Sequence, residues 1–178
     1  VIHLIGTYDK TTSTTFFPKI AANNAYKVIV LKYPNLISST SACRKSDDLN
    51  CHWNYRQELN FGTDLSDKVD IDSTNCIFNR IEKTIKYLNN NFTSENWSKF
   101  INMDTINWRN IILSGHSQGG GHAAYIAKFH KVDRVLMFAS PNEYSSHFKA
   151  PANWVGFESS TPDSNFYAFG NYYDEVVD

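Results

Sequence analysis

A single pentapeptide near the middle of the chain has the residue types and spacing of a serine nucleophile. Gly115-His116-Ser117-Gln118-Gly119 fits the pattern G-x-S-x-G, in which the serine sits on a tight turn between a strand and a helix. The turn needs small residues two positions before and after the serine, because larger side chains there collide with the backbone of the turn. Ser117 is therefore the candidate for attack on an acyl carbonyl.

The sequence on both sides of the pentapeptide favours this strand-turn-helix context. The preceding run, residues 110–114, is apolar, as in a central parallel strand that is covered on both faces. The following segment, residues 119–130, has small and apolar residues at positions that suit one packed helix face. We interpret the pentapeptide as a nucleophile elbow rather than as a glycine-rich turn with an incidental serine.

The other segments alternate between strand and helix patterns, which predicts an α/β fold with a mostly parallel sheet and helices on both faces. The expected strands are residues 1–6, 26–31, 110–114, 134–139 and 166–170, and the expected helices are residues 15–24, 97–101, 119–130 and a segment between Ser73-Thr74 and Asn89-Asn91. Residues 33–72 lack such patterns and are expected to form a long functional or disulfide-pinned loop.

Length and composition limit the classes of protein to consider. A chain of 178 residues, 42% of them hydrophobic, can bury one substantial core, so residues 1–178 are predicted to form a single domain. A formal net charge of -1 gives no overall positive field that would attract nucleic acid. No apolar stretch has the length of a membrane span. We see no metal-ligand spacing, no phosphate-binding loop and no pattern for a protein partner, so neither a cofactor nor a metal is predicted.

Two of the three cysteines lie close together in a polar stretch. Cys43 and Cys51 are near enough in sequence to close a small disulfide loop, and we favour that bridge over two free thiols. Such a bridge predicts an oxidising compartment, either a periplasm or the extracellular space. Cys76 opens a helical pattern and is expected to be a small buried residue.

This order of elements around a serine elbow resembles the α/β-hydrolase superfamily over essentially the whole chain. Within that superfamily, the stretch from Gly115 to Ala124 is similar to secreted bacterial serine esterases and lipases. The resemblance implies a serine hydrolase that cleaves a small-molecule or lipid ester through an acyl-enzyme intermediate, in a secreted or periplasmic protein. It also implies Ser117 as the nucleophile and the backbone N–H of Gln118 as one donor of the oxyanion hole.

The resemblance also implies positions for a second donor and an acid. The second donor comes from the loop after an early strand, where we choose the N–H of Thr7 and keep that of Tyr8 as the alternative. The acid follows the nucleophile in sequence, after a later strand. Asp174 is our choice, and Glu143 remains the alternative.

A histidine base is missing from its expected place in this order. A neutral imidazole must accept the Ser117 proton, and no histidine follows Asp174 in the sequence. His52 and His147 are minor alternatives, because both lie in loop-like segments. We expect the chain to be incomplete at both ends, with the base beyond Asp178. Two other functions stay open: an acyltransferase that uses the same serine, and a hydrolase-like binding module without a base.

Overall fold

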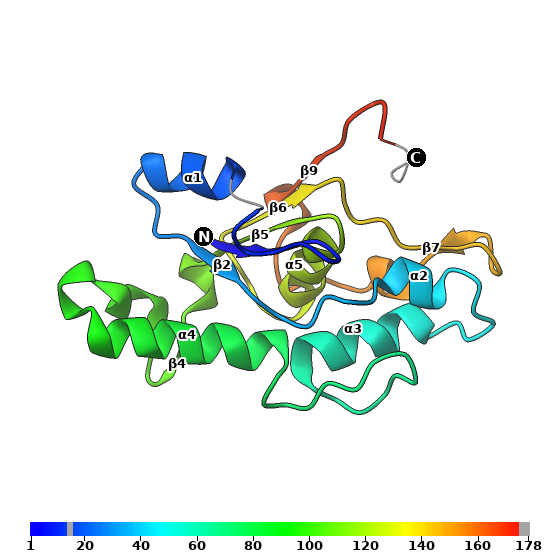
Figure 1. Ribbon diagram of the computed structural model, residues 1–178, viewed down its shortest axis with the longest axis horizontal. Helices are drawn as coiled ribbons and strands as arrows, with labels where there is room; N and C mark the ends of the chain where they lie inside the picture. The colour runs from blue at the N-terminus through cyan, green and yellow to red at the C-terminus, as the bar shows by residue number, and fades with distance from the viewer. Residues whose placement is uncertain (14–15, 175–178) are drawn as a thin grey trace.

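The computed structural model describes residues 1–13 and 16–174, and its centre is a five-stranded parallel sheet (Figure 1). The strands lie in the order β2-β1-β5-β6-β9. Their bounds are Ile29–Leu31 for β2, Ile2–Leu4 for β1, Ile112–His116 for β5, Arg134–Phe138 for β6 and Phe166–Phe169 for β9. Each of the five predicted strands is present with shorter or slightly shifted ends, and the α/β class is confirmed.

Helices cover both faces of the sheet, as predicted. Figure 1 shows α1 on one face and α5 with α4 on the other. Their bounds are Phe16–Asn23 for α1, Ile77–Asn91 for α4 and Gln118–Phe129 for α5. Helix α4 is capped by the buried Cys76, whose sulfur accepts a hydrogen bond from the Asn79 N–H, rather than by Ser73 or Thr74.

The expectation of a structureless loop over residues 33–72 is wrong. This segment contains two helices, α2 at Ser39–Cys43 and α3 at Cys51–Phe61. The buried side of α3 combines Cys51, Tyr55 and Leu59, which are spaced four residues apart, with buried charged and amide side chains. Because the apolar row is short and mixed with polar residues, the sequence pattern did not predict this helix. A disulfide joins Cys43 at the end of α2 to Cys51 at the start of α3, which confirms the predicted bridge.

Short elements connect the larger ones. Residues 97–101, predicted as a helix, form a 3-10 helix at Trp97–Phe100. The remaining short elements are the antiparallel pairs β3 (Ile101–Asn102) with β4 (Thr105–Ile106) and β7 (Tyr144–Ser145) with β8 (Ala150–Pro151), and 3-10 helices at Thr93–Glu95, Trp108–Asn110, Asn153–Gly156 and Asp163–Asn165.

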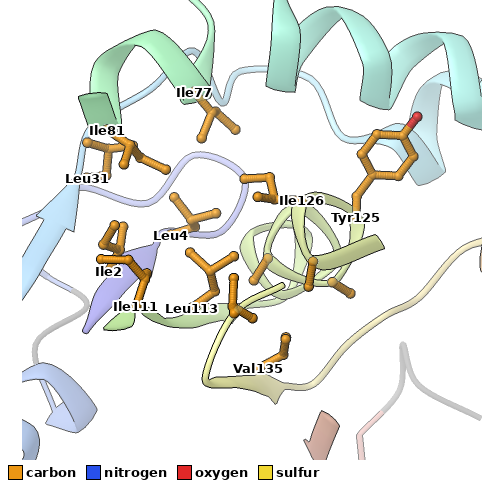
Figure 2. Close-up of a cluster of buried hydrophobic side chains, with 14 of the residues drawn as sticks. Ile2, Leu4, Leu31, Ile77, Ile81, Ile111, Leu113, Tyr125, Ile126 and Val135 are labelled. Atoms are coloured by element: carbon orange, nitrogen blue, oxygen red, sulfur yellow. The ribbon is translucent and has the colours of Figure 1, made fainter. Parts of the chain in front are cut away.

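The main hydrophobic core lies between the sheet and helices α4 and α5 (Figure 2). Ile2, Leu4 and Leu113 point from the strands toward Ile77 and Ile126 on these helices, and all five side chains are buried. Because strand side chains alternate between faces, the intervening residues of β1 and β5 point the other way, toward α1. Burial of this apolar face is what holds the carboxyl edge of the sheet in place.

The strand order creates one position at which the chain changes direction across the sheet. From β1 the chain proceeds to β2 on one side, whereas from β5 it proceeds to β6 and β9 on the other side. The loops that leave β1 and β5 therefore diverge, and a crevice opens between them at the carboxyl ends of the strands. In open parallel sheets this switch point is where ligands bind.

Candidate active site

Ser117 occupies a strained turn between β5 and α5. Its backbone has φ 52° and ψ -124°, a conformation that costs a non-glycine residue free energy and is concentrated at functional sites. The Ser117 N–H donates to the Phe138 carbonyl over 2.8 Å, and the Ser117 carbonyl accepts from the Gly120 N–H over 3.0 Å. Neighbouring strand β6 and the first turn of α5 thus fix the serine at the switch point.

Two glycines allow this turn to be as tight as it is. A Cβ atom on Gly115 would lie 2.2 Å from the Gly119 carbonyl carbon, and a Cβ atom on Gly119 would lie 2.1 Å from the Leu4 carbonyl oxygen. Both distances are far inside van der Waals contact. The residues two positions before and after Ser117 therefore need to be glycine, for the reason that the sequence pattern suggested.

The two predicted oxyanion-hole residues lie together beside the serine. Gln118 is the first residue of α5, so its N–H has no partner within the helix and lies at the positive end of the helix dipole. The Thr7 hydroxyl donates to the Gln118 side-chain oxygen over 2.9 Å. Thr7, Ser117 and Gln118 all line one cavity of about 850 Å³.

Within the loop after β1, the backbone N–H groups of Thr7 and Tyr8 differ in their hydrogen bonding. The Tyr8 N–H donates to the Asn35 carbonyl over 3.0 Å and is therefore occupied. The Thr7 N–H has no hydrogen-bond partner among the residues that the structure describes. The Asn35 side chain donates to the carbonyls of Gly6 and Asp9, over 2.6 and 3.0 Å, which holds the loop in this conformation.

The Glu143 carboxylate forms an ion pair with Arg56 rather than a contact with Ser117. The Arg56 Nε donates to Glu143 Oε1 over 2.6 Å, and the carboxylate also accepts from the Ser39 hydroxyl over 2.5 Å and from the Trp154 indole N–H. Burial alone would raise the pKa of Glu143, but the charge and hydrogen bonds of Arg56 and the bond from Ser39 bring it below its ordinary value. The carboxylate is thus a structural anion.

Arg56 links this buried pair to the elbow. Its Nη1 donates to the Gln118 carbonyl over 3.1 Å, and its side chain lines the same cavity as Ser117. The first turn of α5 is therefore held by a buried cation from α3. Arg56 was not predicted from the sequence, because a charged residue in a segment expected to form a loop gives no signal of burial.

Asp174 lies beyond β9, in the loop that follows the strand. Its backbone N–H donates to the Asn171 carbonyl over 2.9 Å. Since β5, β6 and β9 are parallel neighbours, Asp174 and Ser117 both follow the carboxyl ends of their strands and lie at the same edge of the sheet. β6 lies between their two strands, and Asp174 is not among the described residues that line the cavity with Ser117.

The six histidines all have partners other than the serine. Within the described residues, no hydrogen bond joins an imidazole to the Ser117 hydroxyl. His3 contacts Ser114, His52 lies near Glu143, His116 faces Asp9, His122 contacts Asn60, His130 stacks on Trp108 and His147 contacts Phe148.

Comparisons of the chain with protein-family models, with curated proteins and with solved structures find no match. In the described part of the chain, no group of three or more histidine, cysteine or acidic side chains is arranged to hold a metal ion, and no helix is long and apolar enough to cross a membrane.

Burial of neutral histidines predicts acid-sensitive folding. Burial, aided by the nearby His116, lowers the pKa of His3 to about 4, and burial also lowers the pKa values of His52, His122 and His130. Unfolding returns these groups to about 6.5, so the unfolded chain binds more protons below that pH, and stability falls as pH falls from about 6.5. At pH 5 we expect His3 alone to cost about 2 kcal/mol.

Urea denaturation at pH 7.5 and pH 5 measures this loss. His3→Gln should reduce the difference between the two pH values, while His147→Gln, at an exposed side chain, serves as the control. An equal unfolding free energy at both pH values for the unmodified protein contradicts the prediction.

Proposed function

We propose that this protein is a serine hydrolase of the α/β-hydrolase type that cleaves carboxylic esters, with Ser117 as the nucleophile. The observation that carries the proposal is the strained Ser117 turn at the switch point of the sheet, which opens onto a cavity together with Thr7 and Gln118. A rigid turn of this kind exposes a hydroxyl next to backbone donors, which is what acyl transfer requires.

In the proposed reaction, the Ser117 oxygen attacks the ester carbonyl while its proton passes to a general base. The carbonyl oxygen becomes negatively charged and accepts hydrogen bonds from the N–H groups of Gln118 and Thr7. Collapse of this intermediate breaks the bond to the alcohol, which leaves with the proton from the base. Water then attacks the acyl-enzyme, and the acid product leaves as Ser117 regains its proton.

Asp174 is the proposed acid that orients the base. Its position after β9, at the same edge of the sheet as Ser117, follows the order in which the acid comes after the nucleophile in the sequence. The Cys43–Cys51 disulfide supports the accompanying proposal that the protein is secreted or periplasmic, because such bonds persist in oxidising compartments.

A second candidate function is a hydrolase-like binding module. It is favoured by one observation, namely that no imidazole among the described residues is hydrogen-bonded to Ser117. Such a module would use the same cavity to hold a ligand without cleaving it. The experiment that tests the proposed function also separates these two candidates.

The test is covalent labelling of the encoded protein with a fluorophosphonate, detected by intact mass. We expect one adduct that disappears in Ser117→Ala. Ser41→Ala is the matched control, because Ser41 lines the same cavity outside the elbow, and it should keep the adduct. Circular dichroism shows whether each variant is folded. A folded protein that gives no adduct supports the binding module, and an adduct that persists in Ser117→Ala overturns the assignment of the nucleophile.

A further inference from the structure

Most of the residues that line the cavity beside Ser117 have polar or charged side chains. Helix α2 and its flanks contribute the hydroxyls of Ser38 to Ser41 and of Ser46, and the floor adds Thr7 and Gln118. Ala42 is the one aliphatic residue among the described residues that line it.

The charged residues of the wall are mostly cations. Arg44 and Lys45 follow α2, are exposed, and form no ion pair with any carboxylate that the structure describes. Lys68 also lines the cavity but is paired with Asp67 over 2.8 Å. Asp47 is the single acidic residue in the described lining. Arg44 and Lys45 thus leave the rim with a net positive charge.

The backbone that carries these two cations is fixed on several sides. The disulfide at Cys43 joins the end of α2 to α3, immediately before Arg44. The Arg44 carbonyl accepts from the Ser146 N–H over 2.8 Å and from its hydroxyl over 2.9 Å. The Thr40 hydroxyl donates to the Asn142 carbonyl over 2.7 Å. A rim held in this way loses little conformational entropy when it binds a ligand.

We propose that the substrate is a polar ester with a carboxylate or phosphate group near the scissile bond, which Arg44 and Lys45 bind. This inference rests on the proposed function, since it concerns the same cavity. Arginine binds carboxylate and phosphate through paired N–H donors, and lysine adds a compact positive charge.

The test compares aryl esters that differ in one charge. The acyl arm pairs 4-methylumbelliferyl hemisuccinate with the butyrate, which has the same number of acyl carbons, and the alcohol arm pairs 3-acetoxybenzoate with phenyl acetate. In at least one arm we expect kcat/KM to be about tenfold higher for the charged ester at low salt, and this ratio should fall as salt rises. The arm that shows the preference identifies the part of the substrate that carries the anion.

Removing the two cations should remove the preference. In Arg44→Gln/Lys45→Gln we expect the charged-to-neutral ratio to fall about tenfold, mainly through KM. Lys19→Gln/Lys131→Gln removes the same net charge at exposed positions outside the cavity and should leave the ratio unchanged. The ratio does not depend on the amount of folded enzyme, so partial misfolding does not obscure it.

Two outcomes separate this inference from the proposed function. If both arms favour the neutral ester, or if the cavity variant and the control change the ratio equally, the anionic substrate is wrong while ester hydrolysis by Ser117 stands. If hydrolysis of every ester persists in Ser117→Ala, the proposed function itself fails.

Discussion

Arg56→Met is expected to lower the free energy of unfolding by about 3–5 kcal/mol, because it leaves the Glu143 carboxylate buried without its counter-charge. Both side chains are almost fully buried, at 1% exposed for Arg56 and 6% for Glu143. The same change removes the hydrogen bond from Arg56 to the Gln118 carbonyl at the start of α5. Urea denaturation of the variant at pH 7.5 measures the loss.

The double variant Arg56→Met/Glu143→Gln tests the cause. It removes the unpaired charge, so we expect it to recover a substantial part of the stability that the single variant loses. Lys86→Met is the surface control: its ion pair with Glu82, at 2.6 Å along α4, is partly exposed and should be worth less than about 1 kcal/mol. If Arg56→Met costs no more than the surface control, the buried pair does not stabilise the fold as argued.

The sheet and the elbow could be predicted because their signals are local. An apolar run followed by glycines at fixed distances from Ser117 specifies a strand, a tight turn and a helix within about twenty residues. The close approach of Gly119 to Leu4, which belongs to a distant segment, shows why that spacing is required. The glycine spacing around Ser117 thus reflects a tertiary contact, that of Gly119 with Leu4, although it involves only a few adjacent positions in the sequence.

Helix α3 was not predicted because several of its buried side chains are polar or charged. It buries Arg56, Glu58 and Asn60, each of which makes side-chain hydrogen bonds with other residues. Glu58, for example, accepts the Ile71 N–H over 2.9 Å. Its apolar row is limited to Cys51, Tyr55 and Leu59, and the polar residues around them led the sequence analysis to expect a loop.

The residues that form the cavity wall could not be predicted from the sequence either. Arg44 and Lys45 were ordinary charged residues in a polar stretch, and only the packing of α2 next to the elbow brings them to the cavity that Ser117 lines. The predicted Cys43–Cys51 bridge was the one sequence feature that pointed to an ordered structure there. The spacing of the two cysteines thus gave information about the structure of this segment that the hydrophobic pattern did not give.

Asp174→Asn is expected to lower the turnover of a simple aryl ester by about 10⁴-fold while the protein stays folded. An asparagine keeps the size of the side chain but cannot stabilise the imidazolium that forms when the base takes the Ser117 proton, nor hold the imidazole in the correct tautomer. Steady-state kinetics of purified variants, with folding checked by thermal denaturation, measures the effect.

Asp133→Asn is the matched control, because Asp133 precedes β6 and lies at the opposite end of the sheet from Ser117. Its turnover should stay within about twofold of the unmodified enzyme. Glu143→Gln should act on stability through Arg56 rather than on turnover per folded molecule. If Glu143→Gln instead lowers the turnover of folded protein by orders of magnitude and Asp174→Asn leaves it unchanged, the acid follows β6 and the assignment of Asp174 is wrong.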